Sequence, residues 1–552
     1  MTPRARASLV QVIRSRDLVW PLGLIAVLAI CNFVWLKIDV QNPMYDMAGH
    51  AINTQRLIQS FRDRPLTETL GLVFTLSPYP PLTYLYAAVW GALAWPTADV
   101  FTGAMTGYVA LLVVASHQGG RVLGGRTAGR LSALLVSTYP IVAGLSRHFL
   151  LDVPLVAMTS ACFWALLRAR KFNRAGPALL FGVTLGLGML TKWTLVIFMA
   201  APVLAVGIAA IRRGLSRRHI LNMLAALAVA AAIALPWYGV NLARQIEFLR
   251  IAGGWFANAE GDASLSPAAR LLENIRFLIN DHMVLPAFAL MGAGALIAWI
   301  RGRRRLALML ISAIGLPLLT FSVYPNLDSR YTMPSLVFAA ALTACGFCAL
   351  PRAAPRRIAI GVIVSWAVLG YVAVSFGGLR LINPRIPIRV AWPESSPMAV
   401  VIYAETAHIA GHPDPAPWPI REIVDAILVD RKSVGATKQS IVVSLSNTPR
   451  LEPNILTYLG GSDHLPIAGA AYDVIGQAGE TAFNLNRADY ILAKTGDLGP
   501  VWSLGWGPRV NAALLDPRNP VQNQVLKRGA ITLPDRSVVT IFRVLRPANA
   551  LP

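Results

Sequence analysis

Long apolar runs, separated by short arginine clusters, set the strongest limit on what this chain can fold into. Residues 18–36, 130–146 and 358–376 are examples, and each approaches the roughly 20 residues that a helix needs to cross a bilayer. Only 14% of the 552 residues are charged, whereas soluble domains carry about 25%. The chain is therefore predicted to be an integral membrane protein with many helical spans.

The basic residues between the apolar runs form six clusters, which hold 22 arginines and lysines and are accompanied by a single acid, Asp17. An excess of positive charge in short loops marks the cytoplasmic side of a membrane protein. The formal charge of +23 therefore indicates topology, and we expect no nucleic-acid partner. The clusters lie at residues 4–16, 121–130, 168–174, 212–218, 301–305 and 352–357.

Eleven apolar segments are predicted to span the membrane, with the N-terminus in the cytoplasm and the C-terminus outside. Another apolar segment, 80–96, would carry the basic cluster at 121–130 to the outer side if it crossed. It is therefore predicted to lie in the interface or to re-enter, within a first external loop at 37–99. The predicted spans are 18–36, 100–117, 128–146, 150–167, 177–191, 194–211, 219–238, 283–300, 306–323, 332–350 and 357–376.

This topology places acidic residues and basic clusters on opposite faces. Residues 1–376 hold 13 aspartates and glutamates, and 12 of them fall in external segments. A transporter driven by protons would more naturally carry acids near the middle of the membrane. The distribution favours chemistry at the outer membrane boundary over transport.

The last third of the chain changes character. In residues 377–552 the apolar runs shorten, and 17 basic residues nearly balance 14 acidic ones. Strands are predicted at 441–445, 490–494 and 538–544, and helices at 421–431 and 452–459. We therefore expect a membrane domain at 1–376, followed by a small extracytoplasmic α/β domain at 377–552.

Short polar motifs occur at the external ends of the predicted spans. The first loop reads D-V-Q-N-P-M-Y-D-M-A-G-H at 39–50, and Y-P-P-L follows at 79–82. The others are S-R-H-F-L-L-D-V-P-L at 146–155, G-L-G-M-L-T-K at 186–192, A-L-P-W-Y at 234–238 and S-R-Y-T-M-P at 329–334.

In this order the motifs resemble those of the GT-C integral-membrane glycosyltransferases, of the dolichyl-phosphate-mannose protein mannosyltransferase and aminoarabinose transferase type. The resemblance covers roughly residues 18–376. Two positions depart from the family pattern, because Met47 follows the first-loop acid where glutamate is usual and Tyr79 precedes the prolines where lysine is common. The resemblance implies an all-α GT-C-like fold with about 11–13 transmembrane helices.

The resemblance also implies a reaction. A sugar on a polyprenyl phosphate is attacked by an acceptor hydroxyl, with inversion, and the lipid phosphate leaves. Such a reaction needs a carboxylate near the acceptor as general base and cations near the leaving phosphate. Asp46 is the predicted base, and Asp39 is the alternative.

The remaining site residues follow from the motifs. Contacts to the donor phosphate are assigned to Arg147, His148, Lys192, Arg330 and Tyr331, and supporting roles to His50, Asp152 and Asp328. Structural alternatives stay open: an ion pair between Arg147 and Asp152, a Lys192 that only reaches for the membrane surface, and a His50 without a role. The pattern leaves a metal undefined, although a divalent ion is compatible with it.

The sequence thus predicts a polyprenyl-phosphate-sugar-dependent glycosyltransferase, a hexosyl- or pentosyltransferase, of a bacterial inner membrane. Its partners are the lipid-linked donor, membrane lipids and an acceptor that the sequence does not identify. The alternatives are a transporter or flippase of lipid-linked saccharides, and an assembly or receptor protein without catalysis.

Overall fold

The structure is a computed structural model. It describes residues 15–169, 172–212, 214–377, 385–387, 399–401, 411–471, 485, 488–500, 503–505 and 507–545. The chain forms two compact units. The first comprises residues 1–37, 70–87 and 102–413, and the second comprises 38–69, 88–101 and 414–552. The second unit thus contains two segments of the first loop as well as the C-terminal region, and the domain boundary predicted at 376 stays a prediction.

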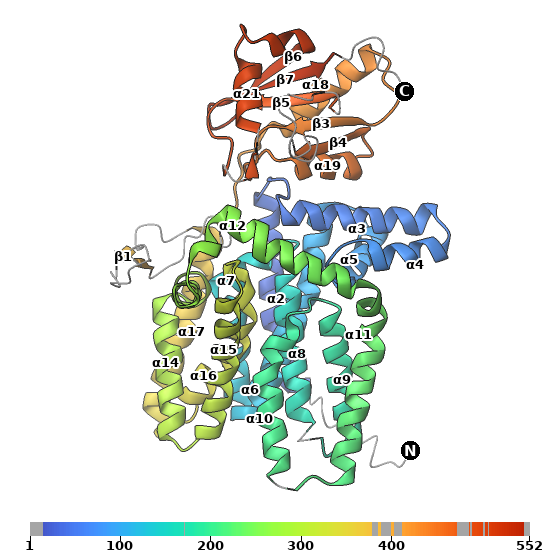
Figure 1. Ribbon diagram of the computed structural model, residues 1–552. Coiled ribbons are helices and arrows are strands. Elements are labelled where there is room, and N and C mark those ends of the chain that lie inside the picture. The colour runs from blue at the N-terminus through green and yellow to red at the C-terminus, as the bar shows by residue number, and fades with distance from the viewer. Residues whose placement is uncertain are drawn as a thin grey trace. The chain divides into compact units, whose positions relative to one another are not determined.

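The first unit is a bundle of helices that run alongside one another (Figure 1). Each of the eleven predicted spans overlaps one of its helices, and two of them share α6, which is broken at Gly125 (φ 86°). The helices are α2 (Ser15–Ile38), α6 (Ala98–Thr138), α7 (Pro140–Leu145), α8 (Asp152–Arg168), α9 (Ala175–Met189), α10 (Leu195–Ile211), α11 (Arg217–Ile251), α14 (Leu285–Ile300), α15 (Arg304–Val323), α16 (Leu336–Phe347) and α17 (Ala353–Phe376).

The lengths and apolar composition of these helices identify a multi-pass membrane protein. Within the described residues, five helices are long and apolar enough to cross a membrane, and a sixth candidate is the pair Pro267–Met283 and Leu285–Ile300, bent by 104°. Shorter apolar helices such as α9 and α10 accompany them. The segment predicted to lie in the interface forms α5 (Leu82–Leu93). Its 12 residues fall short of the roughly 20 needed to cross, and its interfacial position stays a prediction.

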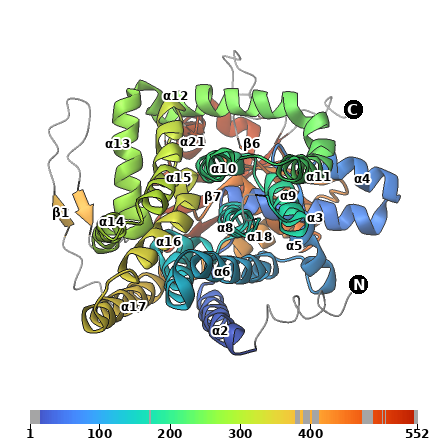
Figure 2. The same ribbon diagram turned by 90° about the horizontal axis from the view of Figure 1, so that it is seen from below.

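Helix α8 lies at the centre of the bundle, and Figure 2 shows it surrounded by α6, α9, α10 and α16. Its side chains are buried along nearly the whole helix. Small residues allow neighbouring helices to approach closely. A Cβ atom added at Gly182 of α9 would lie 2.3 Å from the carbonyl oxygen of Ala226 in α11. This close packing holds α9, which leads into the Lys192 motif, against α11.

The C-terminal part of the second unit is an α/β fold. Its five-stranded sheet has the order β4-β3-β5-β7-β6, with β3 parallel to β4 and β5, and β7 antiparallel to β5 and β6. The strands are β3 (Ser440–Ser444), β4 (Ile467–Ala471), β5 (Tyr490–Lys494), β6 (Val525–Thr532) and β7 (Val538–Val544), and the helices are α18 (Ile420–Ser433), α19 (Pro453–Ser462) and α21 (Gly507–Leu515).

Two apolar clusters cover the two faces of this sheet. One joins Ile423 of α18 and Leu456 of α19 to the sheet residues Val442 and Ile541. The other joins α21 to Val443, Ile491 and Phe542 of the same strands. Adjacent strand residues point to opposite faces, so helices can cover both sides. The predicted α/β character, the three predicted strands and both predicted helices are confirmed.

The second unit also contains first-loop helices. Helix α3 (Asp46–Asp63) packs against α19, and α4 (Leu66–Thr75) follows it, with its residues from Leu70 onward belonging to the first unit. The backbone N–H of Ala98 donates to the hydroxyl of Tyr458 in α19 at 2.8 Å. The first loop is therefore integrated with the C-terminal fold through hydrogen bonds as well as packing.

Candidate active site

One carboxylate and two cations meet at the end of the bundle where α8 begins. Asp152 is the first residue of α8 and is buried. Lys192 follows the end of α9, and its Nζ lies 2.9 Å from Asp152 Oδ1. Arg330 belongs to η4 (Ser329–Ser335), and its Nη1 lies 4.0 Å from Asp152 Oδ2. Three segments that are distant in the sequence thus direct two positive groups toward one acid.

The local structure favours a charged Asp152. A negative side chain at a helix N-terminus is stabilised by the partial positive charge there. A buried carboxylate also requires a paired cation, because desolvation of an unpaired ion costs several kcal/mol. Lys192 supplies this partner, so it does more than reach for the membrane surface, which was the alternative that the sequence left open.

Arg330 and Tyr331 are fixed by their neighbours in a turn. The Nε and Nη2 atoms of Arg330 donate to Asp328 Oδ2 at 2.9 and 2.6 Å, and its backbone N–H donates to Asp328 Oδ1 at 2.8 Å. The Tyr331 hydroxyl donates to Asn326 Oδ1 at 2.6 Å, and Lys192 Nζ lies 5.8 Å from the centre of the Tyr331 ring. The charges of two acids, Asp152 and Asp328, therefore offset those of two cations, Lys192 and Arg330, in this cluster.

The turn that carries these residues is itself held by two acids. Asn326 Nδ2 donates to Glu260 Oε2 at 3.2 Å, and the backbone N–H of Leu327 donates to Asp262 Oδ2 at 2.8 Å. Burial raises the pKa of the Asp262 carboxyl group. Arg330 is thus presented from a turn in which these acids fix the two residues before Asp328.

Arg147 differs from the other cations, because no acid neutralises it. It lies between α7 and α8 with 2% of its surface exposed. Its Nε donates to Asn32 Oδ1 at 3.1 Å, its Nη2 donates to the Ser375 hydroxyl, and its guanidinium lies 5.5 Å from the rings of both Trp35 and Tyr371. Its Nη1 has no hydrogen-bond partner, and no carboxylate pairs with it among the residues that the structure describes. The predicted alternative of an ion pair between Arg147 and Asp152 is wrong.

His148 lies beside Arg147 and contacts Trp35 edge to face, with ring centres 6.2 Å apart. Burial, together with the charges of Arg147 and Arg330, lowers the pKa of His148 to about 4. The imidazole is therefore neutral near pH 7. It can offer a phosphate one hydrogen bond but no full positive charge.

The acids of the first loop belong to the second unit. Asp46 is the first residue of α3 and is exposed, whereas His50, one turn later, is buried. Asp39 accepts the backbone N–H of Asp414 at 2.9 Å, and burial raises the pKa of Asp39. A helix therefore carries Asp46 and His50 four residues apart, as expected, and their roles stay predictions.

Sequence reasoning missed the neutral residues that surround Arg147. Asn32 and Ser375 lie inside apolar runs, 115 and 228 residues from Arg147 in the sequence. A single asparagine within the first span was the available signal for Asn32. The contact of Glu452 with the residue before Asp46 had no signal, because 407 residues separate them.

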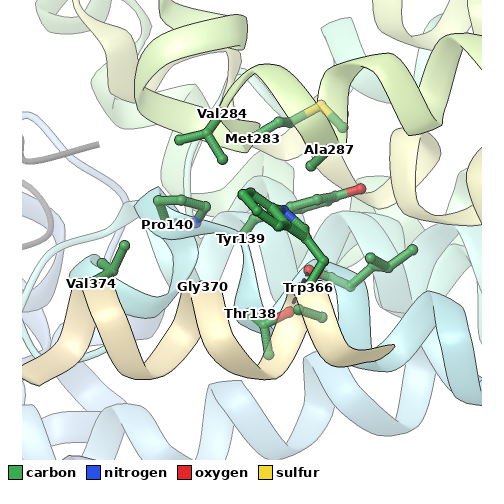
Figure 3. A pocket seen from close by; sticks show the side chains of 11 residues that line it. Thr138, Tyr139, Pro140, Met283, Val284, Ala287, Trp366, Gly370 and Val374 are labelled. Carbon is green, nitrogen blue, oxygen red and sulfur yellow. Dashed lines mark hydrogen bonds between the residues drawn. The ribbon is translucent and has the colours of Figure 1, made fainter. Parts of the chain in front are cut away.

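Among the residues that the structure describes, no three or more histidine, cysteine, aspartate or glutamate side chains form a group that could hold a metal ion. Figure 3 shows an apolar pocket in the first unit, lined by the end of α6, the start of α7 and the start of α14, with α17 on the remaining side. Tyr139, Val284, Trp366 and Gly370 are among its lining residues. Helix α7 carries Pro140 in this pocket and ends at Leu145, two residues before Arg147.

Comparison with known proteins defines the class to which this fold corresponds. The model of the dolichyl-phosphate-mannose-protein mannosyltransferase family matches residues 100–238, which include the motif around Asp152 and the Lys192 segment. The chain is a multi-pass membrane protein with a GT-C-type fold. The resemblance to GT-C glycosyltransferases that the motifs indicated is confirmed.

Particular relatives are known from structure and from sequence. The crystal structure of ArnT from Cupriavidus metallidurans bound to undecaprenyl phosphate superposes with a TM-score of 0.58 at 15% identity, over 95% of this chain and 98% of that one. Its apo structure gives 0.57 at 14% identity, over 94% and 97%. The putative mannosyltransferase YkcB of Bacillus subtilis (strain 168) is 26% identical over 208 residues, which are 37% of this chain and only 28% of the relative.

Proposed function

We propose that this protein is a glycosyltransferase that moves a sugar from a polyprenyl-phosphate donor to an acceptor hydroxyl. The reaction would take place at the external face of a bacterial inner membrane, with the N-terminus in the cytoplasm. The GT-C-type fold supports the reaction class. An ArnT of this fold binds undecaprenyl phosphate, which supports a donor of the same lipid class.

The proposed reaction is a single displacement at the anomeric carbon. The acceptor oxygen forms a bond to this carbon while the bond to the phosphate oxygen breaks, which inverts the configuration. Asp46 takes the proton of the acceptor hydroxyl as general base, and Asp39 is the alternative base. The electron pair of the broken bond stays on the polyprenyl phosphate, whose growing negative charge is stabilised by fixed cations.

The observation that carries the proposal is the buried, uncompensated charge of Arg147. A guanidinium without a carboxylate partner is expensive to bury unless an anion joins it. An arginine fork with an unpaired donor suits the planar recognition of a phosphate. We assign the donor phosphate to Arg147, with Lys192, Arg330 and Tyr331 next to it and a neutral His148 as hydrogen-bond donor.

The apolar pocket of Figure 3 supports the same ligand class. Helix α17 lines the pocket through Gly370 and Val374 and contacts Arg147 through Ser375. An amphiphile with an anionic head and an isoprenoid tail matches a cation next to an apolar surface. A free sugar phosphate has no apolar chain that could fill this pocket.

Transfer from defined donors tests the proposal. The full-length protein is reconstituted in vesicles with polyprenyl-phosphate sugars and a panel of lipid, glycan and peptide acceptors, and labelled product is measured. We expect Asp46→Asn to abolish transfer. Asp39→Asn would do so only if the alternative base is correct.

The matched control is Asp63→Asn, because Asp63 is an exposed acid at the end of the same helix as Asp46. It should leave transfer unchanged. Full activity in both Asp46→Asn and Asp39→Asn would contradict the proposed mechanism. Movement of intact donor across the vesicle membrane without transfer would favour the flippase alternative.

A further inference from the structure

The residue that precedes Asp46 has an unusual backbone conformation. Tyr45 adopts φ 48° and ψ −121°, outside the regions that a residue with a side chain normally occupies. Such a conformation persists only where surrounding contacts fix it. Because α3 begins at Asp46, the backbone at Tyr45 sets the direction in which Asp46 leaves the loop.

Besides the Gly49 N–H of α3, which donates to its carbonyl oxygen, Tyr45 is contacted by the loop between β3 and α19 and by the first turn of α19. The Tyr45 N–H donates to Glu452 Oε1 at 3.1 Å, and its phenol donates to the carbonyl oxygen of Asn447 at 3.0 Å. The Asn454 Nδ2 reaches the Tyr45 carbonyl oxygen at 3.5 Å. Backbone donor, backbone acceptor and side chain are therefore all held by one segment of eight residues.

Glu452 is the buried centre of this arrangement. Only 1% of its surface is exposed, and its Oε2 caps α19 by accepting the Asn454 N–H at 2.8 Å. One carboxyl group thus joins the start of α19 to the residue before α3. Its charged neighbourhood includes Asp46, and burial raises the pKa of Glu452 to about 7.

The position of this loop in the sheet is informative. Strand β3 pairs in parallel with β4 on one side and β5 on the other, and the loop follows its carboxyl end. Ligands of open α/β sheets bind outside the carboxyl ends of strands, at such a switch point. Here the first loop occupies that place, with Tyr45 bonded to Asn447.

A second contact holds the other end of the same loop segment. Asp39 accepts the N–H of Asp414, and Arg450 Nη2 pairs with Asp414 Oδ2 at 3.0 Å. Arg450 and Glu452 belong to the same connection after β3. The segment from Asp39 to Asp46, which carries both candidate bases, is therefore held at its start by Asp414, which pairs with Arg450, and near its end by Glu452.

We infer that Glu452 is a positioning residue, which holds the Tyr45 backbone so that Asp46 is oriented toward the acceptor hydroxyl. This role rests on the proposed function. It gives the C-terminal fold a direct part in the reaction, with the loop at 447–454 forming one wall of the acceptor site. Glu452 acts through Tyr45 and exchanges no proton with the acceptor.

The test compares Glu452→Gln with Arg431→Met in the reconstituted full-length protein. Glutamine keeps the size of the side chain but can accept through one oxygen only. We expect kcat to fall about tenfold or more while the KM for the donor stays within about twofold. Hydrogen exchange in the peptide that contains Tyr45 should become faster. Arg431→Met removes buried hydrogen bonds to Ser440, Ala436 and Lys438, at the amino end of β3 and away from the segment at 447–454, and should leave kcat unchanged.

The outcomes separate this inference from the proposed function. A wild-type kcat in Glu452→Gln, while Asp46→Asn is inactive, would overturn the positioning role alone. Activity losses that follow the melting temperature equally in Glu452→Gln and Arg431→Met would also overturn it, because both variants would then act through stability. Full activity of Asp46→Asn would remove the base and the positioning role together.

Discussion

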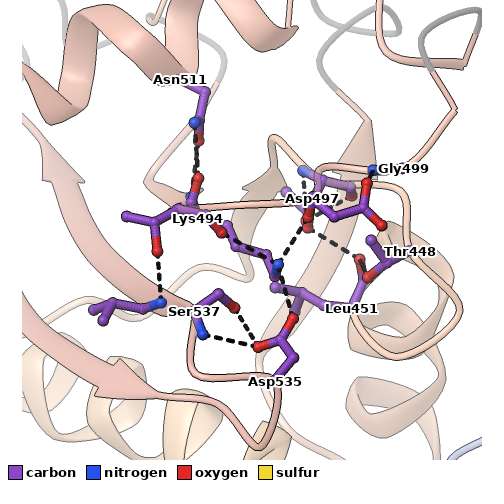
Figure 4. Close-up of polar contacts among 12 residues, drawn as sticks. Thr448, Leu451, Lys494, Asp497, Gly499, Asn511, Asp535 and Ser537 are labelled. Atoms are coloured by element: carbon purple, nitrogen blue, oxygen red, sulfur yellow. Dashed lines mark hydrogen bonds and ion pairs between the residues drawn. The ribbon is translucent and has the colours of Figure 1, made fainter.

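Two buried cations, Arg147 in the helical bundle and Lys494 in the α/β fold, show how differently this chain treats internal charge. Lys494 is 1% exposed, and its three ammonium donors face three acceptors: Asp535 Oδ2 at 3.2 Å and the carbonyl oxygens of Asp497 and Thr495 at 2.7 and 3.3 Å (Figure 4). Arg147 is equally buried, but among the residues that the structure describes its partners are neutral and one of its nitrogen atoms has no hydrogen bond.

This difference distinguishes a cation that stabilises the fold, Lys494, from one that is available to bind a ligand, Arg147. The Lys494 contacts close the loop after β5 onto the turn that precedes β7, and they leave the ammonium no capacity for a ligand. The Arg147 guanidinium keeps both its charge and a donor uncompensated. A buried charge that its own chain fully satisfies stabilises the fold, whereas one left unsatisfied requires an anion from elsewhere.

The largest expected effect is the loss of transfer in Arg147→Met. Removing the cation that we assign to the donor phosphate should lower kcat/KM by about 10²–10³-fold. The free energy of unfolding should change by no more than about 1–2 kcal/mol, because the substitution deletes an unpaired charge and frees only Asn32 and Ser375. Transfer kinetics and thermal unfolding of the same preparations measure the two quantities.

Arg168→Met is the matched control for this prediction. Arg168 lies at the opposite end of α8 and contacts the Trp164 ring at 5.4 Å. Its replacement should leave transfer within about twofold of wild type. If Arg147→Met were fully active but strongly destabilised, the comparison would fail, because Arg147 would then be a structural residue like Lys494.

Lys494→Met should show the opposite behaviour. Two backbone carbonyl groups lose their donor, and Asp535 loses its cation, so we expect the α/β fold to lose about 1–3 kcal/mol of stability. The activity of each folded molecule should stay unchanged. Hydrogen exchange across 490–500, together with kcat normalised to folded protein, would reveal the effect. An unchanged exchange rate would show that these buried contacts do not stabilise the fold.

The sequence predicted the membrane helices because apolar length is a strong and local signal. Strand β4, with the sequence I-A-G-A-A, was not anticipated, because small residues give no alternation to read. Strand β6 was missed because it is an edge strand with mostly exposed residues. Both strands form because neighbouring strands of the sheet complete their hydrogen bonds.

The candidate site was predicted in part. The charged motifs at helix ends nominated Asp152, Lys192 and Arg330, and the structure brings these three together. Spacing along the chain could not reveal which cation pairs with Asp152, since helix packing decides that. The environment of Arg147 depends on neutral residues from α2 and α17, which carry no recognisable motif. Glu452 could not be predicted either, because no recognisable motif marks it.

Glu452 is a buried acid, and the pH dependence of protein stability shows how the fold treats its charge. Burial places its pKa at about 7 in the folded protein, above the value of 4.5 that an ordinary glutamate has. The protonated carboxyl therefore favours folding below about pH 4.5, and this contribution is lost as the pH rises through 7. The stability of wild type relative to Glu452→Gln should accordingly decline between pH 5 and pH 8.

We expect the difference in melting temperature to move by about 2–4 °C over this range, in favour of the glutamine variant at high pH. Scanning calorimetry or fluorimetry at several pH values measures it. Glu422→Gln is the control, because Glu422 is an exposed residue in the first turn of α18. A temperature difference that stays constant from pH 5 to pH 8 would show that Glu452 is no more difficult to ionise than an exposed acid.

The smallest effect concerns the apolar half of the proposed ligand site. Gly370 lines the pocket in Figure 3, and a Cβ atom there would meet no atom within 4 Å. Gly370→Leu should therefore fold normally but fill the pocket, and raise the KM for a long-chain donor by about three- to tenfold. A donor with one or two isoprene units should be affected less. Gly361→Leu is the control, because Gly361 is exposed on the same helix and also has an open surrounding. If Gly370→Leu raised the KM for long-chain and short-chain donors equally, the pocket would not bind the isoprenoid chain. Arg147 would then remain a phosphate contact without an adjacent site for the lipid tail.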